Sequence, residues 1–193
     1  KLQLGEVPGW RRENFLLFAD PARRKLDMVF QFDHFDLGLE AGKFHPRPLR
    51  PGGLADCLGA WQGAQGEVGW NSLYLDNHDQ PRAVSRFGDE EYRYESATAL
   101  ATALHMLRGT PYVYQGEELG MTNSVFGGID DYRDVEALRY SSEAVESGEN
   151  PEDVLAGMCL TGRDNARTPV QWDASENAGF TQGIPWNGVT PHY

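Results

Sequence analysis

Cysteine is scarce in this sequence, which has only Cys57 and Cys159 among its 193 residues. Their separation fits neither a metal-binding nor a redox motif, so we expect two free thiols in a reducing, cytoplasmic environment. No apolar run approaches the about 20 residues that a membrane helix requires, so we expect no association with a membrane. Residues 1–6 do not resemble a signal peptide, and the missing initiator methionine suggests that the natural chain begins further upstream.

Positive charge is also in short supply, with 17 Lys and Arg residues against 29 Asp and Glu residues and a net charge of −12. Such an acidic surface repels phosphate backbones, so we do not expect nucleic acid as a partner. Hydrophobic residues make up 40% of the chain and charged residues 24%, which is typical of a folded globular protein with a real core.

Short runs of β-branched and aromatic residues alternate with longer segments of helical periodicity. Strands are predicted at residues 2–7, 27–32, 70–75 and 111–115. Helical segments are predicted at residues 14–25 with a break at Pro21, and at residues 54–65, 94–108, 135–147 and 151–159. Residues 162–193 are rich in Gly, Pro, Asn and Trp, and we expect an ordered loop there.

This alternation, with strands that are apolar on both faces, is typical of a parallel sheet covered by helices. Both a doubly wound sheet and a β/α barrel fit the pattern. No Gly-x-Gly-x-x-Gly motif follows the first predicted strand, which argues against a dinucleotide-binding sheet. Four strands cannot close an eight-stranded barrel, so a barrel reading implies half of one.

Carboxylates stand where each predicted strand ends, which is the end at which a parallel barrel forms its active site. The residues concerned are Glu6, then Asp33 beside His34, then Asp76 and Asp79 around His78, and finally Glu117 and Glu118. Clustered carboxylates repel one another, and such a set suits a site with one protonated acid beside ionised carboxylates. Glycoside cleavage needs that arrangement. We found no trusted metal-ligand spacing and no Gly-rich anion loop for phosphoryl transfer.

Four segments, in order along the chain, resemble motifs of the oligo-1,6-glucosidase branch of glycoside hydrolase family 13, the α-amylase family. LGEVPG at residues 4–9 resembles the motif of barrel strand five, and WNSLYLDNHDQPR at residues 70–82 resembles that of strand seven. TPYVYQGEELGM at residues 110–121 resembles strand eight. GRDNARTP at residues 162–169, with QWD at residues 171–173, resembles the loop that follows strand eight.

The resemblance implies an α/β fold, the C-terminal half of a TIM-type (β/α)8 barrel. Residues 1–193 would form a partial catalytic domain with strands five to eight and a loop-rich segment at residues 122–193. The N-terminal half of the barrel, the lid domain and the C-terminal β domain would be absent. The family's nucleophilic Asp lies on strand four, so we expect this chain alone to be inactive and the remaining half of the barrel to be its partner.

The activity that the resemblance implies is that of a retaining, exo-acting α-glucosidase on terminal α-1,6- or α-1,4-linked glucose of short oligosaccharides. Glu6 would be the general acid/base, and Asp79 would grip sugar hydroxyls and stabilise the transition state. His78 would hydrogen-bond the same glucose ring, Arg163 would close the pocket, and Glu136 would touch the next sugar. No cofactor and no metal ion are implied.

Other activities within the same family remain open, namely trehalose-6-phosphate hydrolysis, sucrose isomerisation and trehalose synthesis. One departure from the family pattern is Asp76, which stands where the 1,6-glucosidases often have Asn and which bears on linkage preference. A different class is the non-catalytic heavy chain of an amino-acid transporter, and the presence of Glu6, His78 and Asp79 together argues against it. We expect Arg82, Glu117 and Glu118 to form structural ion pairs or scaffolding.

Overall fold

The computed structural model describes residues 1–39 and 42–190 of the chain. The chain folds as two compact units. The first comprises Lys1–Gly38, Arg47–Leu75 and Ala101–Val113, and the second comprises Leu39–Pro46, Asp76–Leu100 and Tyr114–Tyr193. Within the predicted loops, residues 40–41 and 191–193 lie outside the described residues.

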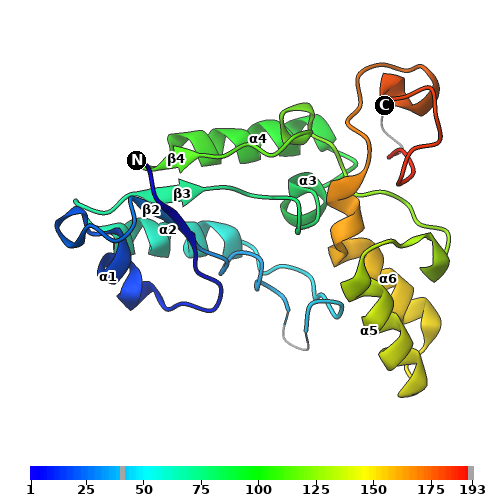
Figure 1. The fold of residues 1–193 in the computed structure, drawn as a ribbon, viewed down its shortest axis with the longest axis horizontal. Coiled ribbons are helices and arrows are strands. Elements are labelled where there is room, and N and C mark those ends of the chain that lie inside the picture. The colour runs from blue at the N-terminus through cyan, green and yellow to red at the C-terminus, as the bar shows by residue number, and fades with distance from the viewer. Residues whose placement is uncertain (40–41, 191–193) are drawn as a thin grey trace. The chain divides into compact units, whose positions relative to one another are not determined.

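The first unit contains a four-stranded sheet whose strands are all parallel and follow one another in chain order (Figure 1). The strands are β1 (Leu4–Glu6), β2 (Met28–Phe30), β3 (Asn71–Leu73) and β4 (Thr110–Pro111). Helical segments connect each pair, with α1 (Phe15–Ala19) before β2, α2 (Gly53–Gln65) before β3 and α4 (Arg93–Met106) before β4. Sequential order without a reversal is the arrangement of a barrel wall, because a doubly wound sheet reverses its strand order at the switch point.

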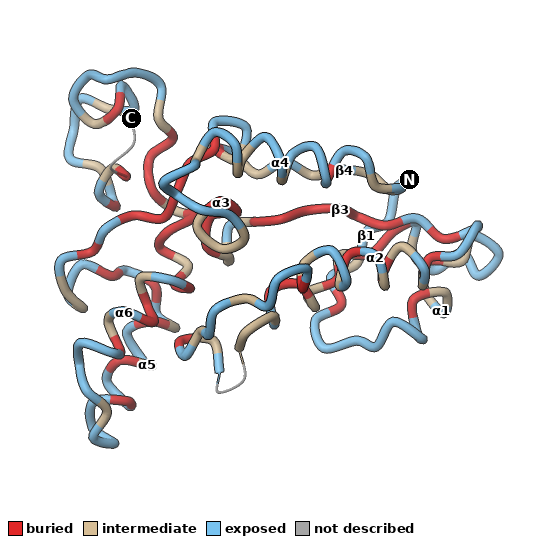
Figure 2. Tube along the Cα trace, turned by 180° about the vertical axis from the view of Figure 1, so that it is seen from behind, coloured by how far each residue is buried: buried red, intermediate tan, exposed pale blue. Residues whose placement is uncertain are grey.

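The core of the first unit lies between the sheet and the helices α1 and α2. It consists of Val7, Phe15, Ala19, Val29 and Trp61. The Phe15 and Trp61 rings meet edge to face with centroids 6.0 Å apart, and Trp61 Nε1 donates to Asp33 Oδ2 at 2.9 Å. Strand β3 is buried along its whole length (Figure 2). Burying such apolar side chains stabilises the unit by roughly 1.5–3 kcal/mol each.

The second unit is built from short helices and long connections. It contains α3 (Ala83–Phe87), α5 (Val135–Glu146) and α6 (Pro151–Thr161), together with the 3₁₀-helices η3 (Glu117–Leu119), η4 (Ile129–Asp131), η5 (Arg163–Arg167) and η6 (Glu176–Gly179). Helices α5 and α6 pack together, and their shared core is Phe44, Phe126, Tyr132, Ala137, Ala144, Val154 and Met158. Phe44 comes from the segment at residues 42–46, so this piece of the loop after β2 belongs to the helical unit.

Capping residues explain where α5 and α6 begin. Asp134 accepts hydrogen bonds from the backbone N–H groups of Glu136 (3.1 Å) and Ala137 (3.4 Å) at the start of α5. Asn150 accepts one from Glu152 (3.0 Å) at the start of α6, with Pro151 in the first turn. Both residues satisfy backbone donors that have no partner inside the helix.

The predicted strands and long helices are confirmed, with strands shorter than expected. The helix at residues 83–87 was not predicted, and residues 162–193 contain η5 and η6 rather than loop alone. Of the predicted apolar stripe only Leu104 of α4 is buried, while Leu100 is half-buried and Ala101 is exposed. Leu107, one residue beyond the end of α4, is half-buried. Helical spacing selects one face of a helix, but burial depends on a neighbouring element that covers it.

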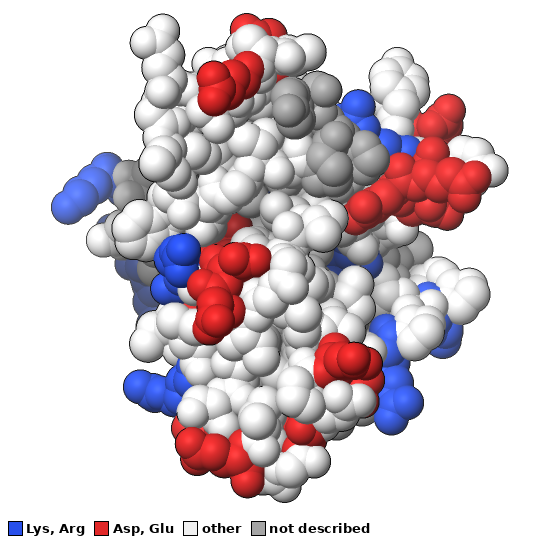
Figure 3. All heavy atoms as spheres, turned by 90° about the vertical axis from the view of Figure 1, so that its right-hand side faces the viewer, with Lys and Arg blue, Asp and Glu red and all other residues white. Residues whose placement is uncertain are grey.

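Both cysteines are free thiols and half-buried. Burial, together with the charge of Asp33, raises the pKa of Cys57 to about 11, so this thiol is protonated at neutral pH. Among the described residues, no helix combines the length and apolar character needed to cross a bilayer. On the face drawn in Figure 3 the acidic side chains stand in separate groups, so the net charge of −12 is not gathered there into one patch.

Candidate active site

The loop that leaves β3 carries His78 and Asp79 into the second unit. Asn77 shapes this loop, because its Oδ1 accepts a hydrogen bond from Asp79 N (2.8 Å) and its carbonyl accepts one from Gln80 N (3.2 Å). Asp76 closes the base of the loop, since its Oδ2 accepts from Ala83 N at 3.1 Å. The loop is therefore held by its own short polar side chains, as turns that begin with Asn or Asp are.

The carboxylate of Asp79 is surrounded by three side chains that carry or can carry positive charge. Arg167 Nη2 donates to Asp79 Oδ1 at 2.8 Å, whereas Arg163 Nε lies 3.8 Å from the same oxygen. His78 Nε2 lies 3.5 Å from Asp79 Oδ2. The Asp79 side chain is 36% exposed and that of His78 is 66% exposed, so both are open to a molecule from solvent.

Arg167 joins the loop after β3 to the beginning of α5. Besides its bond to Asp79, it donates from Nη1 to Asp134 Oδ1 (2.9 Å) and from Nε to the carbonyl of His78 (3.2 Å). Desolvation lowers the pKa of Arg167, but the hydrogen bonds to Asp79 and Asp134 outweigh it and raise that pKa above its ordinary value. A guanidinium that bridges two carboxylates in this way is a strong orienting group.

Glu136, in the first turn of α5, is the third carboxylate that the arginines contact, after Asp79 and Asp134. Arg163 Nε lies 3.0 Å from Glu136 Oε2, and Lys43 Nζ lies 2.5 Å from the same oxygen. Three acids and three bases thus form one network, which we call the Asp79 cluster: Asp79, Asp134, Glu136, Lys43, Arg163 and Arg167. Its formal charges balance, so each carboxylate is held in place by a neighbouring cation.

Asp164, between the two arginines, explains why they face the cluster. It is fully buried and accepts hydrogen bonds from Asp134 N (3.0 Å) and from Asn187 Nδ2 (3.3 Å). It therefore anchors η5 to the start of α5, while the guanidinium groups at either end of η5 extend to Asp79 and Glu136.

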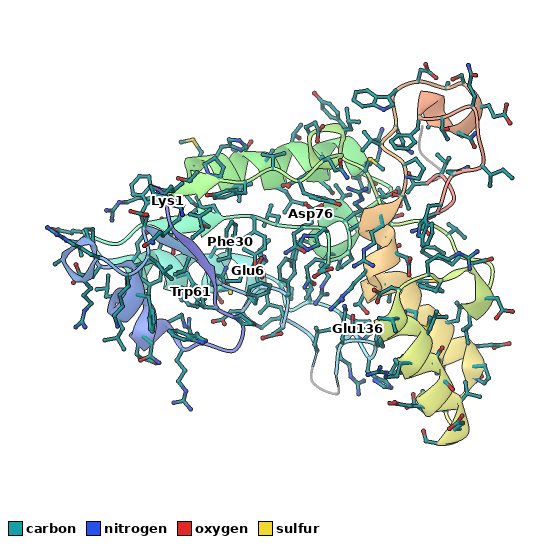
Figure 4. The ribbon with its side chains drawn as sticks, viewed as in Figure 1. Lys1, Glu6, Phe30, Trp61, Asp76 and Glu136 are labelled. Carbon is teal, nitrogen blue, oxygen red and sulfur yellow. The ribbon has the colours of Figure 1, made fainter. Side chains whose placement is uncertain are left out.

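Glu6 belongs to the first unit and is the last residue of β1. It pairs in register with Phe30 of β2 and is exposed at the carboxyl end of the sheet (Figure 4). Burial raises the pKa of the nearby Tyr74, and the negative charge of Glu6 adds to this effect. Tyr74 donates its hydroxyl to the carbonyl of Gln31 at 2.7 Å, so it is a packing residue beside Glu6.

Of the five residues predicted for the site, the structure gathers four in the second unit: His78, Asp79, Arg163 and Glu136. Sequence reasoning missed Arg167, Asp134 and Lys43. The sequence does indicate Arg167 as a candidate, since it stands four residues after Arg163 in the same GRDNAR motif. It does not indicate Lys43, because the contact of Lys43 with Glu136 spans 93 residues of chain.

The chemistry that this arrangement supports is recognition of hydroxyl groups by ionised side chains. Carboxylates accept hydrogen bonds from hydroxyls, and guanidinium and ammonium groups donate to their oxygens. Within residues 1–39 and 42–190, no group of three or more His, Cys, Asp or Glu side chains is arranged to hold a metal ion. The sheet of the first unit has the strand order of a β/α-barrel wall, and the Asp79 cluster of the second unit has the donors and acceptors that recognise hydroxyl groups.

The sequence model of the alpha amylase catalytic domain matches residues 1–193, and the chain belongs to this family of glycoside hydrolases. Two curated relatives are oligo-1,6-glucosidases: that of Parageobacillus thermoglucosidasius is 55% identical and that of Bacillus cereus 52% identical, each over the whole chain. A trehalose-6-phosphate hydrolase of Bacillus subtilis is 46% identical. The chain spans 35% of the length of each of these three relatives.

The trehalulose synthase of Pseudomonas mesoacidophila MX-45 is a solved structure with the same fold. It superposes with a TM-score of 0.92 at 43% identity, and the match covers 98% of this chain and 35% of that one. The predicted family, its oligo-1,6-glucosidase branch and the partial TIM-type barrel are thereby confirmed.

Proposed function

We propose that the full-length protein containing this chain is a retaining, exo-acting α-glucosidase. Its substrates would be short oligosaccharides with terminal α-1,6- or α-1,4-linked glucose. The observation that supports this best is the Asp79 cluster, in which a partly exposed carboxylate is oriented by Arg167 at 2.8 Å in the loop after β3. The identity of 55% to an oligo-1,6-glucosidase favours the same chemistry.

In this proposal Glu6 protonates the glycosidic oxygen and later removes a proton from the attacking water. Asp79 accepts hydrogen bonds from two hydroxyls of the glucose unit that is cleaved, and these bonds strengthen as the ring flattens towards the oxocarbenium-like transition state. His78 donates to the same ring. The nucleophilic carboxylate comes from the part of the barrel that the relatives have beyond the matched 35%.

Glu136, Arg163 and Lys43 form the outer part of the site in this proposal. Arg163 contacts Glu136 at 3.0 Å and lies 3.8 Å from Asp79, so it stands between the first sugar and the next. We propose that Arg163 closes the pocket behind the terminal glucose, which restricts cleavage to chain ends. Glu136 accepts a hydrogen bond from the neighbouring sugar. No cofactor takes part in these steps.

The remaining half of the barrel is the partner that this chain requires. In the sheet, β1 and β4 are the outer strands, and each has one neighbouring strand. Their outer backbone groups are suited to further parallel strands. We further propose a cytoplasmic location, because the two half-buried thiols are free.

A second candidate is a disaccharide-converting activity that uses the same carboxylates. It is favoured by the TM-score of 0.92 to a trehalulose synthase and the 46% identity to a trehalose-6-phosphate hydrolase. A panel of isomaltose, maltose, sucrose and trehalose 6-phosphate, offered to the full-length protein, separates these activities. A non-catalytic transporter heavy chain would turn over none of them.

The acid role of Glu6 is tested by the substitution Glu6→Gln in the full-length protein. We expect kcat for isomaltose to fall by about 10²–10⁴-fold, the contribution of a general acid. The loss should be much smaller for an aryl α-glucoside with a good leaving group, because that group hardly needs a proton to depart. Equal losses on both substrates would refute the acid role.

A further inference from the structure

Two carboxyl groups of the second unit lie side by side near the base of the loop that carries Asp79. Asp76 is 2% exposed, and its Oδ2 accepts a hydrogen bond from Ala83 N at 3.1 Å. Its other oxygen, Oδ1, is buried and has no donor among the described groups. The side chain of Glu117 lies within hydrogen-bonding range of Asp76. Burying a carboxylate oxygen without a hydrogen-bond donor costs free energy of folding, so the position of Glu117 beside Asp76 requires an explanation.

Two ionised carboxylates cannot hydrogen-bond to each other, because both are acceptors only. The contact becomes a bond when one of the two carries a proton. Each carboxyl accepts one backbone hydrogen bond, and burial raises the pKa of both, so neither effect decides which one holds the proton. The positive charge of Arg82 favours the ionised form of Asp76, which leaves Glu117 as the donor. Glu117 Oε2 accepts from Tyr114 N at 3.1 Å, so its second oxygen is the one to hold the proton. Burial and the charge of Asp76 raise the pKa of Glu117 to about 9.

The charges that face this pair agree with a single negative charge on it. Arg82 is fully buried, and its guanidinium donates to carbonyl oxygens, including that of Gln115 at 2.7 Å. Tyr114 places its ring 5.5 Å from the same guanidinium. Glu118 is exposed, and it accepts a hydrogen bond from Gly116 N at 2.7 Å. One buried cation is balanced by one buried anion, whereas an ionised Glu117 would leave an uncompensated charge.

We propose that Glu117 is a neutral carboxylic acid that donates a hydrogen bond to Asp76 Oδ1, and that this pair positions the loop bearing His78 and Asp79. Asp76 holds both ends of that loop through its bond to Ala83 N. The proton on Glu117 keeps Asp76 in place and links it to the backbone after β4 through Tyr114. When the proton is lost, two adjacent anions repel, and the base of the loop opens.

Infrared difference spectroscopy of the full-length protein tests the protonation directly. The spectrum of the wild type minus Glu117→Gln at pH 7 should contain the C=O stretch of a protonated carboxyl group, because the proton donor Glu6 is present in both proteins and cancels. Asp76→Asn should shift this band in frequency or remove it, because the carboxylate that accepts the hydrogen bond from Glu117 is replaced by an amide. Glu118→Gln is the matched control and should leave the band unchanged. A spectrum of the wild type minus Glu117→Gln that lacks this band would overturn the proposal.

Stability as a function of pH gives a second readout that needs no enzymatic activity. A carboxyl with a pKa of 4.5 in the unfolded chain and about 9 in the folded one binds a proton on folding between those values. Its stabilising contribution is complete below pH 4.5 and is lost as pH rises. Between those limits the unfolding equilibrium constant of the wild type should rise, relative to Glu117→Gln, by about tenfold per pH unit. Parallel pH profiles for the two proteins would contradict the proposal.

The pH dependence of kcat tests whether the Asp76–Glu117 pair positions the loop with His78 and Asp79. This test rests on the function proposed above. We expect kcat of the wild type to fall reversibly above about pH 9 and this limb to shift or vanish in Glu117→Gln, while Glu118→Gln keeps it. An unshifted limb beside a confirmed infrared band would refute the positioning role. A protein that shows the band but hydrolyses no α-glucoside would refute the proposed function. The proton shared by Glu117 and Asp76 would still be supported by the band.

Discussion

Asp79 is held by Arg167 more directly than by Arg163, and this difference decides how each arginine contributes to the site. The guanidinium of Arg167 donates to the carboxylate at 2.8 Å, while Arg163 is 3.8 Å away and lies closer to Glu136, at 3.0 Å. Arg167 therefore orients Asp79, and within the proposed function Arg163 would lie at the boundary between the first sugar and the next.

The substitution Arg167→Gln tests this assignment. Hydrogen bonds to charged groups contribute roughly 1.5–3 kcal/mol, so we expect kcat/KM for isomaltose to fall about 10- to 100-fold. Arg133→Gln is the matched control, because Arg133 is exposed and its guanidinium donates to the backbone carbonyls of Asp130 and Tyr132. A loss in Arg167→Gln no larger than in Arg133→Gln would show that Asp79 needs no such partner. Thermal unfolding of both variants separates a local effect from a loss of folding.

Single residues of the site were predictable where a motif carried them. His78 and Asp79 stand in one contiguous motif that follows a predicted strand, so their position after that strand followed from the sequence. Arg163 stands in another motif, in the segment after α6. Asp134 was not predictable as a site residue, because it also has the ordinary role of capping α5 through Glu136 N and Ala137 N. A capping pattern does not reveal that the other carboxylate oxygen of Asp134 binds an arginine.

At the scale of elements, the contact between α6 and the loop after β2 depends on one glycine. A Cβ atom at Gly157 would lie 1.9 Å from the carbonyl oxygen of Phe44, which is buried in the core of the second unit. The loop carries Lys43 next to Phe44, and Lys43 Nζ is 2.5 Å from Glu136. The close approach at Gly157 thus places a cation at the outer part of the site.

We predict that Gly157→Ala destabilises the full-length protein by about 1–3 kcal/mol, since an added methyl group must displace backbone. Gly59→Ala in α2 is the matched control: a Cβ there meets no atom within 4 Å. Replacing an exposed glycine inside a helix should stabilise by about 0.5–1 kcal/mol. Urea unfolding of both variants measures the two shifts, and a neutral Gly157→Ala would contradict the packing argument.

The elements themselves were predictable to different degrees. Helix α5 has a capping aspartate and an apolar face, and both signals lie within the segment. Helix α3 has five residues, Ala83–Phe87, which is too short for its periodicity to show. The strands are two or three residues long in the sheet although their apolar runs are longer, because pairing depends on the neighbouring strand.

For the whole molecule, the two outer strands of the sheet are the feature that matters most. Strands β1 and β4 have one neighbour each. Leu4 on β1 is 41% exposed, and Met106, the last residue of α4, is 81% exposed. Unpaired strand edges and exposed apolar side chains favour association with other chains. Both are explained if the rest of the barrel completes this chain.

We therefore predict that a protein consisting only of Lys1–Tyr193 does not hydrolyse a chromogenic α-glucoside and tends to aggregate. Size-exclusion chromatography and a standard release assay check both points. The full-length protein, assayed in parallel, is the control. Turnover by the isolated chain would show that the nucleophile is not supplied from outside it.

Local sequence was sufficient for the family and for the order of the strands and the longer helices, and it supplied Glu6, His78, Asp79 and Arg163 as candidate site residues. Packing alone determined the contacts that join distant segments. Lys43 meets Glu136 across 93 residues and Arg167 meets Asp79 across 88, and neither separation follows from a periodicity. The same holds for Asp76 and Glu117, because a proton shared by two carboxyls exists only where folding has buried them together.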